Sequence, residues 1–197
     1  TDVFNPFGYS FAISDDNRQP VEALRFLYSL GETSYIDAIA VTNQQFDKAK
    51  KGLKARTNIA NYDLSLSYVN LGEAGNLVGS DMAGELWGFG IRYEIARTIP
   101  LTGTPYTKAI IGCDNTLENG LGLNMEYYYN GQGQKDANNY DWTNYLAGNI
   151  SQLARDYLYF GISYIFDEIT NARLSILMNQ NDGSRIIYPA YYRNIFQ

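Results

Sequence analysis

Apolar and polar residues alternate along several segments of this chain, and the clearest case is residues 78–96, VGSDMAGELWGFGIRYEIA. From residue 86 onward, one parity is aromatic or aliphatic, namely Trp87, Phe89, Ile91, Tyr93 and Ile95. The other parity is small or charged and includes Arg92 and Glu94. Because successive side chains of a strand point to opposite faces, this pattern predicts β-structure with one apolar face and one polar face.

The same pattern recurs 33 positions later in the chain. Gly79-x-Asp81 is repeated as Gly112-x-Asp114, and Gly88-x-Gly90 with Glu94 is repeated as Gly120-x-Gly122 with Glu126, one residue being missing at the turn. Each copy predicts a β-hairpin, with turns near residues 85 and 119, whose two carboxylates share the polar face. A repeated hairpin is typical of a sheet that grows by adding hairpins.

Alternation elsewhere extends this pattern to about 11 strands. The further strands are expected at residues 21–30, 35–42, 52–59, 63–70, 156–166, 172–180 and 185–196. Tight connections are expected near residues 32, 61, 85, 119, 169 and 182, and longer ones near 47, 73, 101 and 143. Strands of this length with mostly alternating short and long connections predict an all-β fold, an antiparallel up-and-down transmembrane β-barrel.

Two segments fall outside the strand pattern. Residues 1–20 are expected to be irregular, and residues 131–155 to form a long outer loop whose first half, GQGQKDANNYD, is flexible by composition. In its second half, Trp142 and the apolar residues after it recur at helical spacing, with Asp141 as the N-cap. A short helix and an extension of the strands beyond the membrane both remain open for this half.

Composition narrows the classes of function. The 197 residues favour a single domain, and a net charge of −6 argues against nucleic acid as a partner. Histidine is absent and Cys113 is the single cysteine, which removes histidine-dependent catalysis, an internal disulfide and most metal sites. We therefore expect no enzyme activity, no cofactor and no metal. The 18 tyrosines suit positions with one apolar and one wet side, as at a membrane surface.

Three runs, GSDMAGELWGFGIRYE, GCDNTLENGLGLNMEYYYNG and MNQNDGS, resemble hairpins of large porin-like outer-membrane β-barrels of Gram-negative bacteria. The opening VFNPFGYSF resembles a segment that precedes strands in such proteins. The resemblance implies a bacterial outer-membrane location, with the lipid bilayer and its lipopolysaccharide as partners. Since such barrels have an even number of strands and usually end on an aromatic residue, an odd count and the ending Ile195-Phe196-Gln197 predict a piece of a larger barrel.

Parity divides the candidate functional residues into two sets. The expected lumen-facing charges are Arg25, Lys54, Arg56, Asp81, Arg92, Glu94, Lys108, Asp114, Glu126 and Arg173. The expected lipid-facing residues are Trp87, Phe89, Ile91, Tyr93, Leu123, Tyr127, Phe160 and Ile162. The charges form either a selectivity ring or a network of mutually paired wall charges that keeps the interior wet.

Four functions are compatible with these patterns. The first is a polar-lined channel for small solutes or ions. The second is a structural barrel sheath around a partner, such as other subunits, a periplasmic protein or a multihaem cytochrome of an outer-membrane conduit. The third is an enzyme in which Asp114 and Glu126 perform glycoside chemistry. The fourth is a soluble β-sandwich adhesin that buries the Trp87 face against a second sheet, which extraction without detergent would reveal.

Overall fold

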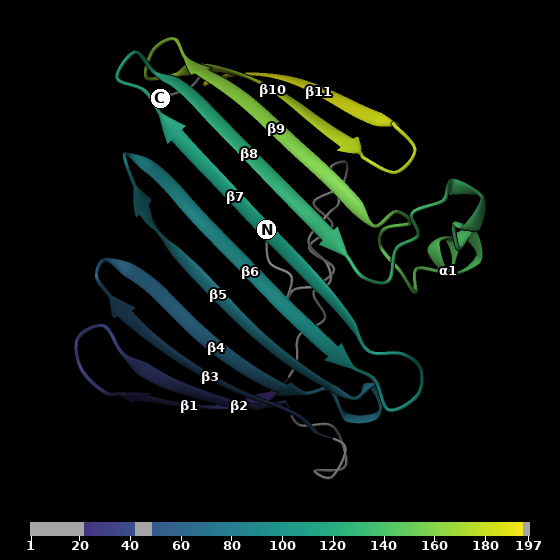
Figure 1. The fold of residues 1–197 in the computed structure, drawn as a ribbon. Helices are drawn as coiled ribbons and strands as arrows, with labels where there is room; N and C mark the ends of the chain where they lie inside the picture. Colours follow the sequence, from purple (N-terminus) through teal and green to yellow (C-terminus); the bar gives the residue numbers. More distant parts are fainter. Residues whose placement is uncertain (1–21, 42–48, 195–197) are drawn as a thin grey trace. The chain divides into compact units, whose positions relative to one another are not determined.

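A computed structural model describes residues 22–41 and 49–194 of the chain. Eleven strands form one antiparallel sheet in which each strand is hydrogen-bonded to its neighbours in sequence, in the order β1 to β11 (Figure 1). This confirms the all-β, up-and-down architecture predicted from the alternation. Within the described residues, β1 and β11 are the two ends of the strand order, so the sheet is not closed.

The chain divides into two compact units, Thr1–Gly84 with Glu94–Lys108, and Glu85–Tyr93 with Ala109–Gln197. The first contains β1 (Ala23–Ser29), β2 (Tyr35–Val41), β3 (Lys50–Ile59), β4 (Tyr62–Asn70), the 3-10 turn η2 (Gly72–Ala74) and most of β5 (Asn76–Leu86). The second contains β8 (Leu121–Asn130), η3 (Ala137–Asn139), α1 (Trp142–Leu146), β9 (Asp156–Ile165), β10 (Thr170–Asn179) and β11 (Arg185–Arg193). Residues of β6 (Phe89–Ile99) and β7 (Tyr106–Thr116) belong to both.

Strand register gives the first unit one polar and one apolar face. Lys54 lies opposite Asp37 on β2 and opposite Ser67 on β4, and Ser65 lies opposite Asp81 on β5. One residue along, Leu53 lies opposite Tyr68, which lies opposite Val78. Directly opposed residues of antiparallel strands share a face, so the predicted parity of β3, β4 and β5 holds across all three strands.

The second unit repeats the division. Glu126 on β8 lies opposite Tyr159 on β9, and Arg173 on β10 lies opposite Ser163 on β9. Leu123 lies opposite Ile162, which lies opposite Leu174. The polar and apolar faces therefore run without a register slip from β8 to β11.

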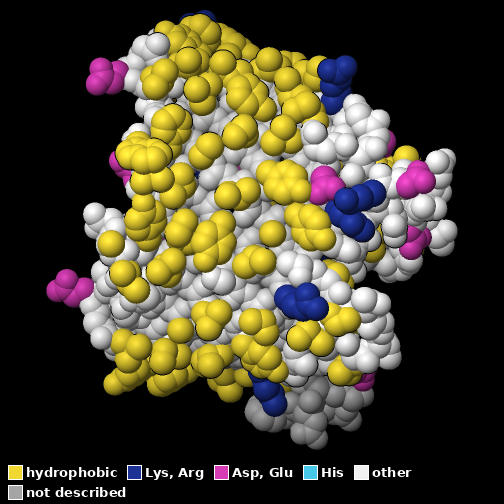
Figure 2. Space-filling model, in the orientation of Figure 1, with side chains coloured by type: hydrophobic (Ala, Val, Ile, Leu, Met, Phe, Trp, Pro, Cys, Tyr) yellow, Lys and Arg dark blue, Asp and Glu magenta, His cyan; other side chains and the backbone are white. Residues whose placement is uncertain are grey.

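The apolar face of each unit is exposed along its length. Leu66 is 61% exposed, Ile111 61%, Met125 49% and Phe160 38%, although all four lie near the centres of their strands. Hydrophobic side chains cover most of the face seen in Figure 2, and the charged side chains on that face lie mainly toward the strand ends. None of the helices in the described residues combines the length and the apolarity needed to cross a membrane.

The first repeated hairpin turns later in the chain than its sequence suggests. The turn was expected near residue 85, but β5 continues to Leu86 and the two-residue turn is Trp87–Gly88, with φ of 54° and 78°. Positive φ at both positions is the geometry that matches the twist of a two-residue hairpin. Gly84 lies inside β5, where an added Cβ would come within 2.3 Å of the Tyr62 ring. Trp87 therefore lies in the turn and not on a strand face.

The remaining strand and turn predictions agree with the structure within a few residues. Ala60 and Asn61, both with positive φ, make the turn expected near residue 61. The irregular segment predicted for residues 1–20, the connection near residue 47 and the chain ending at 195–197 lie outside the described residues, apart from Ala49 just before β3.

Candidate functional site on the polar face

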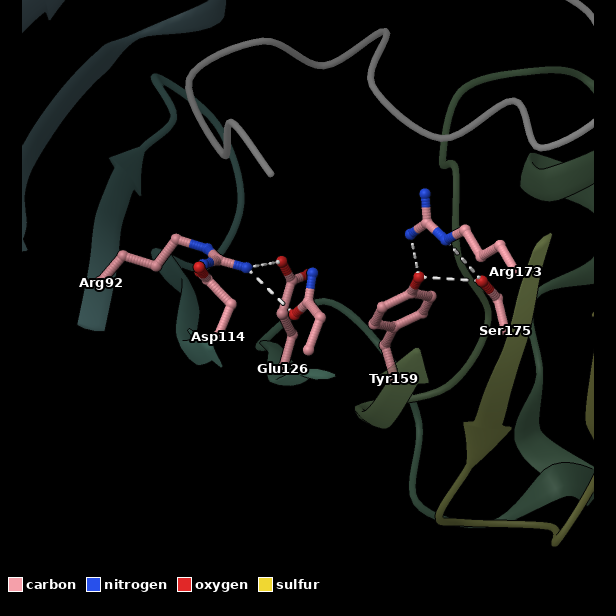
Figure 3. A network of polar contacts seen from close by, with 7 residues as sticks. Arg92, Asp114, Glu126, Tyr159, Arg173 and Ser175 are labelled. Atoms are coloured by element: carbon pink, nitrogen blue, oxygen red, sulfur yellow. Dashed lines mark hydrogen bonds and ion pairs between the residues drawn. The ribbon is translucent and has the colours of Figure 1, made fainter. Parts of the chain in front are cut away.

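Arg92 is the centre of a polar cluster in the second unit (Figure 3). From β6, its Nη1 donates to Asp114 on β7, and its Nη2 donates to Glu126 Oε1 on β8 at 2.6 Å and to Asn124 Oδ1 at 3.2 Å. One guanidinium thus bridges the two carboxylates of the second repeated hairpin. Charge-assisted bonds of this kind are stronger than neutral ones.

The repeated glycines make room for this cluster. A Cβ added to Gly112 would lie 3.0 Å from Glu126 Cγ and 3.4 Å from Arg92 Cζ, and one added to Gly90 would lie 3.1 Å from Asp114 Oδ2. In each Gly-x-Asp motif the glycine and the aspartate lie on the same face of the sheet. The glycine has no side chain, and the neighbouring long side chains occupy the space that it leaves.

In the first unit, described charges of the polar face form further ion pairs. Arg25 Nη2 lies 2.6 Å from Asp37 Oδ2, Lys54 Nζ lies 3.1 Å from Asp81 Oδ2, and Arg56 Nη2 lies 2.6 Å from Asp63 Oδ2. Ser65 also donates to Asp81, and Asn58 Nδ2 donates to Asp63 Oδ1 at 2.9 Å. Most of these side chains are about a third exposed or more, so the pairs contribute little stability individually.

Arg173 is bound by hydroxyl groups instead of carboxylates. Its Nε donates to Ser175 Oγ at 3.0 Å, and its Nη2 donates to the Tyr159 hydroxyl. Lys108 Nζ lies 5.7 Å from the centre of the Tyr106 ring, a cation–π contact. Glu94 follows Arg92 by two residues on β6 and so shares its face.

The sequence named most of these residues but not all of their partners. The structure joins Arg92 to Asp114 and Glu126, and Lys54 to Asp81, all of which parity had placed on one face. It joins Arg25 to Asp37 and Arg56 to Asp63, whose carboxylates were not among the candidates. Both Asp37 and Asp63 lie in predicted strands next to the arginine, and this adjacency is the signal that was missed. For Asp37 it was hard to use, because apolar and polar residues do not alternate clearly in residues 35–42.

The expected lipid-facing residues lie on the opposite face, apart from Trp87 in its turn. Phe89, Ile91 and Tyr93 alternate with Arg92 on β6, and Leu123, Tyr127, Phe160 and Ile162 occupy the apolar registers of β8 and β9. Tyr127 also donates from its hydroxyl to Asp156 Oδ1 at 2.5 Å, close to the end of both strands. An apolar ring with its polar tip at a strand end suits a membrane–water boundary.

Chemically, the polar face carries pairs of opposite charge, together with Arg173 and Lys108, which contact hydroxyl groups and an aromatic ring. Within the described residues, no group of three acidic or cysteine side chains lies close enough together to hold a metal ion. Asp114 and Glu126 share one counter-ion, Arg92. The arrangement can hydrate this face and bind ions.

The loop between β8 and β9 is held by several hydrogen bonds, although its first half was expected to be flexible. Gln134 forms a parallel bridge with Ala154, and the buried Asn130 side chain donates to the Ala154 carbonyl at 3.1 Å. Gly133 is needed there, because an added Cβ would lie 2.0 Å from that carbonyl oxygen. Composition alone missed these bonds because they join residues some 20 positions apart in the sequence.

The predicted helix is present in this loop and is short. Helix α1 covers Trp142–Leu146, and the Asp141 carboxylate accepts from the Asn144 backbone N–H at 3.0 Å, as an N-cap does. This backbone hydrogen bond, with a second from the Asn144 side chain, lowers the pKa of Asp141. The apolar residues at helical spacing continue in the sequence to Leu153, but the helix ends at Leu146, two residues before the positive-φ glycine Gly148.

Tyr140 fastens this loop to the turn between β10 and β11. Its hydroxyl donates to Asp182 Oδ2 at 3.1 Å and accepts from Asn179 Nδ2 at 2.9 Å. The Ser184 hydroxyl and amide lower the pKa of Asp182, so its carboxylate stays ionised in the neutral range. Burial raises the pKa of Tyr140, which keeps the phenol protonated and able to donate.

We expect Tyr140→Phe to loosen this attachment, because one hydroxyl provides both bonds. Amide hydrogen exchange in residues 135–150 should accelerate at least about fivefold, the effect of losing even one hydrogen bond worth about 1 kcal/mol. Tyr145→Phe is the matched control, because that hydroxyl forms no hydrogen bond to the described residues.

Since the pKa of Asp182 is lowered, the protection of wild-type amides from exchange should hold above about pH 4 and decline as the pH falls through that lowered pKa. Equal exchange in both variants would show that Tyr140 does not hold the loop.

No family model matches the chain, and no curated protein or solved structure is significantly similar to it.

Proposed function

We propose that this chain forms part of an outer-membrane, porin-like β-barrel whose polar-lined interior passes small solutes or ions. The observation that carries the proposal is the exposed apolar face of the antiparallel sheet. Leu66, Ile111 and Met125, from three different strands, are each about half or more exposed near their strand centres. In water such a face would need a covering layer, and in lipid it needs none.

Strand length supports the same proposal. Strands β3 to β10 contain 9 to 11 residues. A tilted strand of about 9–11 residues spans the hydrocarbon core of a bilayer. Because each strand is hydrogen-bonded to its neighbours in the sheet, the backbone polar groups between strands are satisfied, as lipid requires.

The opposite face supports an aqueous interior. Arg25, Lys54, Arg56 and Arg92 each reach a carboxylate on this face, and charged groups of both signs are stable where water reaches them. The pairing favours a hydrated wall over a ring of one sign of charge. In this proposal the lipid bilayer and its lipopolysaccharide contact only the apolar face.

The test is conductance of the full-length protein. Purified from membranes in detergent and added to a planar bilayer, it should produce stable, stepwise currents that detergent alone does not produce. A protein that inserts into lipid but passes no current would contradict the channel and support a sheath around a partner such as a cytochrome. A protein released from cells without detergent would contradict both membrane functions.

A further inference from the structure

The polar face of β9, β10 and β11 carries one charged side chain within the described strands, and it is Arg173. By register, the other residues on this face are Tyr157, Tyr159, Gly161, Ser163, Ile165, Asn171, Ser175, Leu177, Asn179, Ile186, Tyr188, Ala190 and Tyr192. The charged residues Asp156, Arg185 and Arg193 of these strands belong to the opposite parity. Arg173 is therefore a cation without a carboxylate beside it on this stretch of wall.

Two buried hydroxyls fix the Arg173 guanidinium in place. Ser175 is 3% exposed and Tyr159 is 9% exposed, and their hydroxyl oxygens lie 3.0 Å apart. The guanidinium carbon also lies 5.9 Å from the centre of the Tyr159 ring. A side chain held from two sides loses less conformational entropy when it binds a ligand.

The two hydroxyls occupy one edge of the guanidinium and leave another edge open. The Ser175 hydroxyl accepts from the Nε–H and the Tyr159 hydroxyl accepts from one Nη2–H. Three of the five guanidinium N–H groups are not used by these two hydroxyls. Figure 3 shows the remaining terminal nitrogen pointing away from both hydroxyls. The Nη1–Nη2 edge presents parallel donors at the spacing of two oxygens of a carboxylate or phosphate.

We propose that Arg173 is a binding position for the carboxylate or phosphate group of an anionic solute. The inference rests on the proposed function, because the lumen brings the solute to this face. Ser175 and Tyr159 are positioning residues, and the Nη1–Nη2 edge binds the anion. Arg92 differs, because two carboxylates already occupy its donors.

Anion binding is measured in an experiment that does not depend on conductance. The anion site and the channel function can therefore be disproved independently. The full-length protein in detergent is unfolded thermally in chloride at constant ionic strength, with increasing inorganic phosphate in one series and succinate in another. A ligand that binds the folded state raises the unfolding midpoint in proportion to its occupancy. We expect a saturable rise for the wild type with at least one probe, and the series that responds identifies the group bound.

Matched variants assign the rise to Arg173. Arg173→Gln should weaken the apparent affinity about tenfold, equivalent to about 1.4 kcal/mol. Arg56→Gln removes the same charge from the polar face but from a pair with Asp63, and it should keep wild-type affinity. Arg173→Lys retains the charge without the planar edge and should lie between them, and Tyr159→Phe should weaken binding without abolishing it.

No saturable rise with either probe in the wild type would overturn the proposal. So would equal affinities in the Arg173→Gln and Arg56→Gln variants, since that result would mean a general effect of wall charge. Should Arg173→Gln fail to fold, the order of wild type, Arg173→Lys and Tyr159→Phe decides, and unchanged affinity in both variants overturns the site.

Discussion

Met125→Arg should destabilise the protein in lipid by about 2–4 kcal/mol, the cost of an arginine at the middle of a barrel's lipid face. Met125 is 49% exposed and lies midway along β8, on the face of Leu123 and Tyr127. If that face meets hydrocarbon, the guanidinium has neither water nor a partner there. The free energy of unfolding is measured by urea titration of the full-length protein in lipid vesicles.

Leu121→Arg is the matched control, because it places the same side chain on the same strand and face but beside the turn that follows Leu117. Near the membrane surface the cost should fall to about 0–1 kcal/mol. Equal costs at positions 121 and 125 would show no dependence on depth, and the apolar face would then not be a lipid face.

Arg92→Gln should cost about 1–3 kcal/mol, the second largest effect expected. Its removal leaves Asp114 and Glu126 without their shared counter-ion, and Glu126 has only 15% of its side chain exposed to solvent. A poorly hydrated charge that loses its partner is destabilised by more than the net value of the pair. The same urea titration measures the loss.

A double variant distinguishes repulsion between the two carboxylates from the loss of the packing contacts of the arginine side chain. Arg92→Gln combined with Glu126→Gln removes one charge of each sign, so it should be more stable than Arg92→Gln alone. Arg56→Gln, from a pair whose members are each about 40% exposed, should have little effect. A double variant no more stable than the single one would mean that charge at the cluster is unimportant.

Alternation predicted the faces of this sheet because period two is a local property of a strand. It did not predict which charges pair, since pairing depends on the stagger between strands. Arg25, for example, lies directly opposite Ile39 yet reaches Asp37, two residues away. The repeated glycines did indicate the surroundings of Arg92, because a residue without a side chain and a carboxylate recur at fixed spacing on its face.

Local signals failed where distant residues decide the structure. A turn was expected near residue 85, but β5 continues to Leu86, and Gly84 leaves room for the Tyr62 ring on the neighbouring strand. Residues 131–141 looked flexible, but Tyr140 is bound by Asn179 and Asp182, about 40 residues later. Arg173 was named as a wall charge, and only the structure revealed the two hydroxyls that hold it.

The turn at Trp87 has a practical consequence for locating the two ends of the strands. The chain has two tryptophans: Trp87, 90% exposed in the β5–β6 turn, and Trp142, 54% exposed at the start of α1 between β8 and β9. Three strands, β6, β7 and β8, separate these connections, so they lie at opposite ends of an up-and-down sheet. In a protein that crosses a bilayer, each side then carries its own natural fluorophore. A quencher confined to one side of a vesicle would dim one tryptophan and spare the other, giving the orientation of insertion without an introduced label.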